Sequence, residues 1–202
     1  MFIFGSKSFA EPLENGQEVQ KDSDLTYYLT VNYDGKDYDA VESSDTQISK
    51  ISSDVILVED RIPYGLTFKG FVETNDGSIG AVKRSDGSSC AGYVVAGVNG
   101  LKYDTNTGVV SYKVKNLMAG CSLTVGIITH TPSTVDDPNT AYVEVRRDFY
   151  NSATAGERFL TSKSNTVHVF MGEENATLYN VKYEYTGDIP KGAPDVSILT
   201  SY

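Results

Sequence analysis

Leu25-Thr-Tyr-Tyr-Leu-Thr-Val-Asn-Tyr33 is the stretch that decides the fold class, because it combines Tyr, Thr and Val with the two-residue spacing of a β-strand. A second stretch, Val109 to Lys115, repeats the pattern. It places Val110, Tyr112 and Val114 on one face and polar side chains on the other. Such alternation is typical of strands that are buried on one side, so the chain is expected to be built from half-buried strands.

The same alternation recurs along the chain. Between Val55 and Asp60, the side chains of Ile56, Val58 and Asp60 share one face. Further runs of this kind cover residues 123–129, 142–145, 166–170 and 178–185. Turn-forming clusters separate the runs, at residues 34–35, 75–77, 86–87, 99–100 and 104–108. We found no convincing helical periodicity over twelve residues. The sequence therefore predicts an all-β, antiparallel β-sandwich.

A change in composition near Gly172 suggests a boundary. Residues 187–194, Gly-Asp-Ile-Pro-Lys-Gly-Ala-Pro, have the Gly and Pro density of a linker or loop. About thirty residues follow the boundary, too few for a core of their own. We expect a domain over residues 1–172, and a short C-terminal extension over residues 173–202 that holds a linker and a further strand or truncated repeat.

Composition excludes several classes. The 202 residues include 17 Lys and Arg against 27 Asp and Glu, for a net charge of −10, which is unlike a protein that binds nucleic acid. Two His and two Cys leave little for a zinc site. No apolar run approaches the roughly 20 residues of a membrane-spanning helix, and the apolar start Met1–Phe4 is too short for a signal peptide.

Catalytic signals are weak. His130 and His168 are the two candidate bases, and neither accompanies a Gly-x-Ser-x-Gly motif or another recognisable nucleophile. The segments 104–108 and 136–139 resemble fragments of calcium loops but fit hairpin turns better. We expect no turnover enzyme, no metal and no cofactor. The enzyme alternative is a small hydrolase or a carbohydrate-active accessory domain.

Cys90 and Cys121 each stand at the start of a predicted strand and are candidates for a disulfide. In an extracellular protein the bond would close a loop of about thirty residues, worth about 3–4 kcal/mol in the chain-entropy model. Two buried free thiols are the alternative, and the sequence leaves both open.

Three segments in order carry a family resemblance. They are residues 7–32 with Tyr28-Leu-Thr-Val-Asn32, residues 55–68 with Asp60-Arg-Ile-Pro-Tyr-Gly-Leu66, and residues 148–169 with Asn151-Ser-Ala153. Together they resemble the Ig-like repeat domain of bacterial cell-surface proteins, the "DUF-eleven" type, and its relatives, the isopeptide-forming domains of Gram-positive pilins and adhesins. Residues 179–194 look like the start of a Listeria–Bacteroides (internalin B-type) or mucin-binding-type repeat.

The resemblance implies an Ig-like sandwich at the bacterial cell surface, with its leader and anchor outside this segment. It would act as a stalk, spacer or adhesive module. Its partners would be neighbouring repeat modules and a host protein or glycan, and the 14 Tyr residues supply possible contact area. A glycan- or protein-binding sandwich module is the alternative function.

The resemblance also implies a self-made cross-link. In the isopeptide relatives a lysine amine attacks an asparagine carboxamide beside a buried acid. Matched by motif, Lys21 is the amine, Asp60 the acid and Asn151 the amide, with Lys7 and Asn165 as substitutes. Burial suits the reaction because it favours the neutral amine and the protonated acid.

Overall fold

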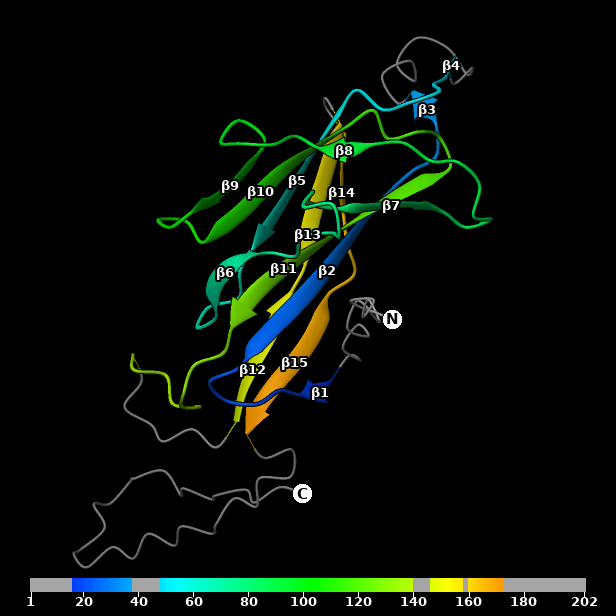
Figure 1. The fold of residues 1–202 in the computed structure, drawn as a ribbon. Coiled ribbons are helices and arrows are strands. Elements are labelled where there is room, and N and C mark those ends of the chain that lie inside the picture. Colours follow the sequence, from blue (N-terminus) through cyan, green and yellow to red (C-terminus); the bar gives the residue numbers. More distant parts are fainter. Residues whose placement is uncertain (1–15, 38–47, 140–145, 158–159, 173–202) are drawn as a thin grey trace, which may run out of the picture.

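The chain folds into β-sheets (Figure 1). The computed structural model describes residues 16–37, 48–139, 146–157 and 160–172, and every regular element in these ranges is a β-strand. The prediction of an all-β, antiparallel architecture is confirmed. The strands predicted at residues 142–145 and 178–185, and the extension over residues 173–202, lie outside the described residues.

The largest sheet has β5 and β10 at its centre. Its order is β14-β13-β5-β10-β8, and β9 also pairs with β10. Its strands are β5 (Val55–Arg61), β8 (Tyr93–Val94), β9 (Leu101–Asp104), β10 (Val109–Lys115), β13 (Ala153–Glu157) and β14 (Leu160–Lys163). All its pairings are antiparallel.

The second sheet is organised by β11, which pairs with β2, β6 and β7. Its strands are β2 (Asp24–Tyr33), β6 (Thr67–Phe71), β7 (Ala81–Arg84) and β11 (Cys121–His130). The β2–β11 register runs without a break from Asp24–His130 to Tyr33–Cys121. Because β11 pairs on its other side with β6 and β7, β2 is the edge strand of this sheet among the described residues.

A common core lies between these two sheets. The first sheet contributes inward side chains such as Val58 and Val110, and the second contributes Leu123, Val125 and Ile127; these five are at most 1% exposed. Burying a side chain of this size stabilises the fold by about 1.5–3 kcal/mol. The alternation predicted for Val110, Tyr112 and Val114 is therefore confirmed.

A third sheet has the order β1-β15-β12, and in it β1 runs parallel to β15. Its strands are β1 (Gln17–Glu18), β12 (Arg146–Asn151) and β15 (Val167–Gly172). A two-stranded sheet joins β3 (Lys36–Asp37) to β4 (Ile48–Ser49). Figure 1 shows β12 and β13 following one another in yellow, so that this part of the chain leaves the third sheet near Ser152 and enters the first.

The turn chemistry follows the sequence. Between β9 and β10, the backbone N–H of Gly108 donates to the carbonyl of Asp104 and that of Asn106 to its carboxylate, which makes this segment the expected hairpin turn. After β5, the Leu66 N–H donates to the Pro63 carbonyl, and Gly65 has a φ of +94°, which a glycine adopts readily.

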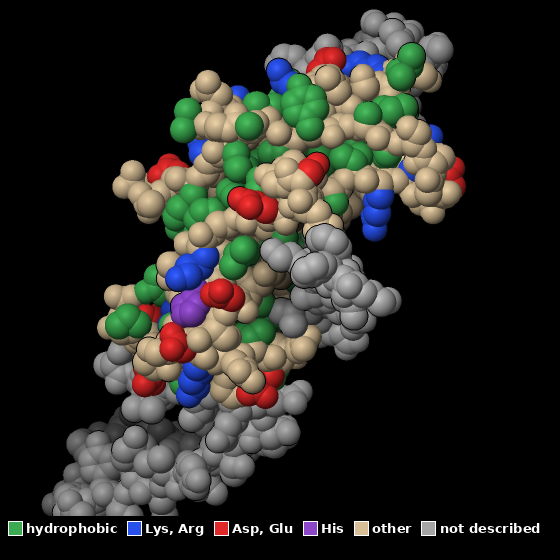
Figure 2. Space-filling view, viewed as in Figure 1, with side chains coloured by type: hydrophobic (Ala, Val, Ile, Leu, Met, Phe, Trp, Pro, Cys, Tyr) green, Lys and Arg blue, Asp and Glu red, His purple; other side chains and the backbone are tan. Residues whose placement is uncertain are grey.

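On the surface, acidic and basic side chains are mixed. Figure 2 shows Lys and Arg scattered among Asp and Glu on the face drawn, without a large patch of a single sign. Within the described residues, no helix has the length and apolarity needed to cross a membrane.

Candidate functional site

Asp60 and Asn151 form a buried pair at the point where the chain passes from β12 to β13. Asp60 lies on the inner face of β5 with Ile56 and Val58, and its backbone pairs with Val110 and with Ala153, two residues beyond Asn151. The Asn151 amide Nδ2 donates to Asp60 Oδ2 at 3.0 Å. The two residues are only 1% and 3% exposed.

Two tyrosines complete the surroundings of this pair. Tyr112 reaches it from β10, within the same sheet, and Tyr27 reaches it from β2 in the facing sheet. Burial, together with the negative charge of Asp60, raises the pKa of both tyrosine hydroxyls. Burial also raises the pKa of the Asp60 carboxyl to about 6, although the hydrogen bond from Asn151 acts in the opposite direction.

Tyr27, Asp60, Tyr112 and Asn151 are called the polar cluster below. Each has one buried side-chain oxygen without a hydrogen-bond partner among the described residues: the two tyrosine hydroxyls, Asp60 Oδ1 and Asn151 Oδ1. Buried polar atoms are nearly always partnered, because leaving one unpaired costs about 1–3 kcal/mol. Three such oxygens near the Asp60 carboxyl, in addition to its own Oδ1, make the cluster unusual among the described residues.

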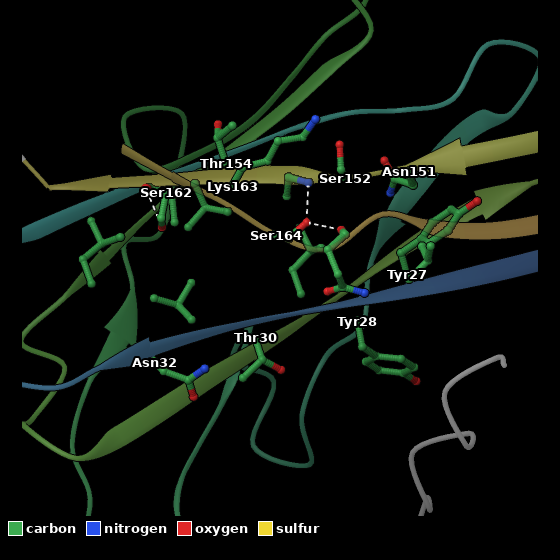
Figure 3. Close-up of a pocket in the computed structure, with 18 of the residues that line it drawn as sticks. Tyr27, Tyr28, Thr30, Asn32, Asn151, Ser152, Thr154, Ser162, Lys163 and Ser164 are labelled. Atoms are coloured by element: carbon green, nitrogen blue, oxygen red, sulfur yellow. Dashed lines mark hydrogen bonds between the residues drawn. The ribbon is translucent and has the colours of Figure 1, made fainter. Parts of the chain in front are cut away.

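A groove of about 820 Å³ opens beside the cluster, between the edge strand β2 and the segment that runs from Asn151 to Asn165. Figure 3 shows Tyr28, Thr30 and Asn32 along one wall, with Ser152, Thr154 and Ser162 to Ser164 on the other. Tyr27 and Asn151 belong both to the cluster and to the groove lining. The Ser164 hydroxyl accepts a hydrogen bond from the Ala153 N–H at 2.9 Å, which holds the far wall together.

The structure brings together two of the three residues predicted for a cross-link. Asp60 and Asn151 are in contact, whereas Lys21 has an exposed side chain in the turn before β2. The substitute Asn165 is exposed, and the substitute Lys7 lies outside the described residues. The side chain that β2 directs to the Asp60–Asn151 pair is Tyr27. The amine of the predicted cross-link thus stays a prediction.

Cys90 and Cys121 form a disulfide, which decides between the two states left open by the sequence. Their Cα atoms lie 6.0 Å apart. Cys90 lies in the connection from β7 to β8, and Cys121 is the first residue of β11. The bond therefore ties a connection between the two main sheets to the central strand of one of them.

Each of the two histidines contacts an aspartate on a neighbouring strand. His130, the last residue of β11, contacts Asp24 at 2.7 Å and Asp22 at 3.1 Å, and these carboxylates raise its pKa. His168 contacts Asp148 at 2.6 Å across β15 and β12. Among the described residues, no group of three or more His, Cys, Asp or Glu is placed to hold a metal ion.

Tyr27 and Tyr112 are the site residues that the sequence reasoning missed. The signal was present, because the alternation placed Tyr112 with Val110 and Val114, and Tyr27 with Leu25, on an apolar face. On the apolar face of a predicted strand, however, a tyrosine is expected simply as a residue that favours strands. Only the packing of the two sheets brings both tyrosines near enough to Asp60 for its charge to raise the pKa of their hydroxyls.

The large exposed tyrosines, which bear on the glycan alternative, stand on three different segments. Tyr64 follows β5, Tyr93 lies in β8, and Tyr150 lies in β12, where its ring stacks on His168 at 4.4 Å. No single strand presents an exposed row of them in the described residues.

Comparison with known proteins finds likeness in structure and not in sequence. No family model matches the chain, and no curated protein matches it. Among solved structures, it is similar to the N-terminal domain of the Streptococcus gordonii adhesin Sgo0707, with 14% identity and a TM-score of 0.44 over 78% of this chain and 30% of that one.

Two further structures are similar at the same level. Domains D2 and D3 of the major pilin SpaD from Corynebacterium diphtheriae give 14% identity and a TM-score of 0.42, over 76% of this chain and 48% of that one. A collagen-binding domain from a Staphylococcus aureus adhesin gives 10% identity and a TM-score of 0.36, over 74% of this chain and 88% of that one. The chain spans less than half of each of the first three matched structures. These matches are to adhesin and pilin domains, and no sequence family supports the repeat types suggested by the motifs.

Proposed function

We propose that this chain is a structural module of a bacterial cell-surface protein, which holds neighbouring modules apart and transmits force between them. The observation that carries the proposal is the Cys90–Cys121 disulfide, which ties the sandwich together where β11 begins. A bond of this kind persists in oxidising surroundings, as expected for an extracellular module. The mixed, acidic surface suits a soluble module that repeats along a stalk.

Force spectroscopy on a tandem polyprotein tests the proposal. A load-bearing module should unfold in one cooperative event, at a force comparable to that of an Ig domain included in the same polyprotein. The disulfide should hide the chain between Cys90 and Cys121, so that the oxidised module extends by about 10 nm less than Cys90→Ser/Cys121→Ser. Unfolding in several low-force steps would contradict a load-bearing role.

A self-made cross-link is a second candidate, supported by the buried contact between Asp60 and Asn151. In this reaction a neutral lysine amine attacks Cγ of Asn151, the new Nζ–Cγ bond forms, and the Cγ–Nδ2 bond breaks. Asp60, with its raised pKa, moves a proton from the amine to the leaving nitrogen, which departs as ammonia. Such a bond would add a covalent path for force across the cluster.

Intact-mass measurement tests this candidate, because the reaction removes one ammonia, about 17 Da, from the chain. Asn151→Ala should abolish the loss. Of Lys7→Ala and Lys21→Ala, the variant that restores the full mass identifies the amine. A wild-type chain at full mass, after allowance for the disulfide, rules the cross-link out and leaves the proposal of a structural module intact.

A further inference from the structure

The outer face of the first sheet carries more basic than acidic side chains. The even-numbered residues of β5 and β10 point into the core, so the odd-numbered ones form the outer face, and the register extends it onto β9, β13 and β14. Its basic residues, called the basic face below, are Arg61, Lys102, Lys113, Lys115 and Lys163. Figure 3 shows the Lys163 side chain directed away from β2, as this placement requires. The acidic residues of the outer face are Glu59 and Asp104. A chain with a net charge of −10 thus has one sheet face on which cations outnumber carboxylates.

The strand register sets three of these cations close together. Ser111 of β10 pairs with Lys102 of β9, and Lys113 and Lys115 follow Ser111 at successive outward positions. Neighbouring strands are about 4.8 Å apart and successive outward residues about 6.7 Å, so the three ammonium groups can reach one extended ligand. Among the described residues, no ion pair includes a member of the basic face. Mutual repulsion therefore opposes folding, and the two carboxylates offset it only in part.

Protection of the sheet edges does not account for these cations. Lysines on exposed edge strands discourage pairing with another chain. Lys102 and Lys163 fit this role, because β9 and β14 are edge strands among the described residues. Arg61, Lys113 and Lys115 do not fit it, because β5 and β10 have paired strands on both sides. The cations on the central strands therefore point to an anionic ligand.

The apolar residues of the outer face favour one kind of ligand. Leu57 is 38% exposed and pairs with Lys113, and Tyr93 is 50% exposed and pairs with Lys115. A protein interface usually has an apolar, aromatic centre that is depleted in lysine. Two separate apolar side chains among lysines do not make such a centre. They do suit a chain of sugar rings, whose C–H faces pack on apolar side chains while their anionic substituents meet the ammonium groups.

We propose that the basic face, with Lys113 and Lys115 at its centre, binds a linear sulfated polysaccharide. Sulfate groups along such a polymer can each meet a cation, and the sugar rings between them can pack on Leu57 and Tyr93. The five strands from β14 to β9 span about 19 Å, which gives an extended polymer room for several contacts at once. The acidic remainder of the surface repels the polymer and so confines it to this face. The site does not depend on the mechanical role, which force spectroscopy tests separately.

Fluorescence anisotropy with labelled heparin, a linear sulfated polysaccharide, tests the proposal. The full oxidised chain at pH 7.5 should bind heparin in 50 mM NaCl. Raising NaCl to 200 mM should weaken the affinity by roughly 10- to 50-fold, as expected when about four cations displace the counterions of a polyanion. Desulfated, N-acetylated heparin should bind about 10-fold more weakly or less. No saturable binding in 50 mM NaCl, or equal affinity for the desulfated polymer, would overturn the proposal.

Paired variants locate the polymer on the face. Lys113→Gln/Lys115→Gln should weaken binding by roughly 10-fold in 50 mM NaCl and reduce its salt dependence by about half. Lys69→Gln/Lys83→Gln removes the same charge from exposed positions on the second sheet and should change the affinity by less than about 2-fold. Glu59→Gln removes a carboxylate from the outer face and should strengthen binding by roughly 3-fold, a gain that a misfolded chain would not show.

Two further outcomes would overturn the proposal. Equal losses in the two double variants would mean that heparin responds only to the net charge of the chain. Analytical ultracentrifugation in 50 mM NaCl tests the other partner that charge allows, a second copy of this acidic chain. Association of the wild-type chain that Lys113→Gln/Lys115→Gln abolishes would assign the basic face to contacts between copies.

Discussion

Asp60 and Asp148 are both strand carboxylates that contact a side-chain nitrogen, yet their pKa values shift in opposite directions. Asp60 lies between the two main sheets, and burial raises its pKa to about 6. Asp148 lies on β12, three residues before Asn151, with its side chain 33% exposed. Partial burial raises its pKa too, but hydrogen bonds from Arg146 and His168 outweigh that effect, and the net shift is downward.

The difference shows what decides the state of a carboxylate in this fold. Asp148 Oδ1 receives two hydrogen bonds from the Arg146 guanidinium, at 3.0 and 2.8 Å, and contacts His168. Asp60 accepts one hydrogen bond from a neutral amide and is almost completely buried. Charged donors and solvent favour the ionised form, and a single neutral donor in an apolar interior does not. Strand β12 thus carries a stabilised surface charge at Asp148 and contributes Asn151 to a buried site in which Asp60 has no ion-pair partner among the described residues.

The largest expected effect on stability is that of removing the disulfide, and it also tests whether the disulfide and Asp60 contribute independently to the free energy of unfolding. Cys90→Ser/Cys121→Ser should lower the free energy of unfolding by about 3–4 kcal/mol, because the open chain gains entropy when unfolded. Urea unfolding of oxidised and reduced wild type should show the same loss, and reductant should leave the double variant unchanged. The pH dependence due to Asp60 should persist in the double variant; its disappearance would mean that the two regions are coupled.

The next effect concerns the pH dependence that Asp60 creates. Its pKa is about 6 when folded against an ordinary 3.8, so its contribution favours folding below pH 4 and is lost as pH rises through 6. The free energy of unfolding of wild type, relative to Asp60→Asn, should therefore fall by about 2.5 kcal/mol between pH 4 and pH 8. Tyr27, Tyr112 and Asn151 face the carboxyl, and none of them titrates in this range to mask the effect. A flat difference would show that a cation already neutralises Asp60.

A third effect separates the hydrogen bond from the charge. Asn151→Ala removes the described donor to Asp60 and should lower the free energy of unfolding by about 2 kcal/mol at pH 8, since the carboxylate is left unpaired. The loss should be smaller at pH 4.5, where Asp60 is protonated. Asn165→Ala is the matched control, because Asn165 is exposed, and it should change stability by less than about 0.5 kcal/mol.

The central strands, and the position of Asp60 on an apolar strand face, were predictable from the sequence. Alternation identified the core faces of β2, β5, β10 and β11, and it set Asp60 on the same face as Ile56 and Val58. A carboxyl on an apolar face is a signal in itself, and the structure confirms that this one is buried. The chain turns at Pro63–Gly65 and Asp104–Gly108 were also predictable, because their residue types favour turns.

The β13–β14 hairpin and the other residues around Asp60 could not be predicted, because their positions depend on contacts between segments that are distant in the sequence. The β13–β14 hairpin, with Ala153-Thr-Ala-Gly-Glu157, lacks the β-branched and aromatic residues that mark a strand, and pairing with β5 determines its conformation. Likewise, Lys21 was matched by motif, although its place relative to Asp60 depends on how one sheet packs against the other. Tyr27 is next to Asp60 for the same reason.

The smallest effect completes the comparison at Asp148. Because its pKa is lowered in the folded state, its contribution to stability is present above its ordinary pKa and is lost as pH falls through the lower, folded value. Asp148→Asn should therefore lower the free energy of unfolding by about 0.5 kcal/mol at pH 7, and by less in 0.5 M salt, since the side chain is partly exposed to screening solvent. The Asp60 variant should keep its effect in the same salt, because burial shields it from mobile ions. Equal sensitivity of both variants to salt, measured by urea unfolding at two ionic strengths, would contradict the contrast between a solvated and a buried carboxylate.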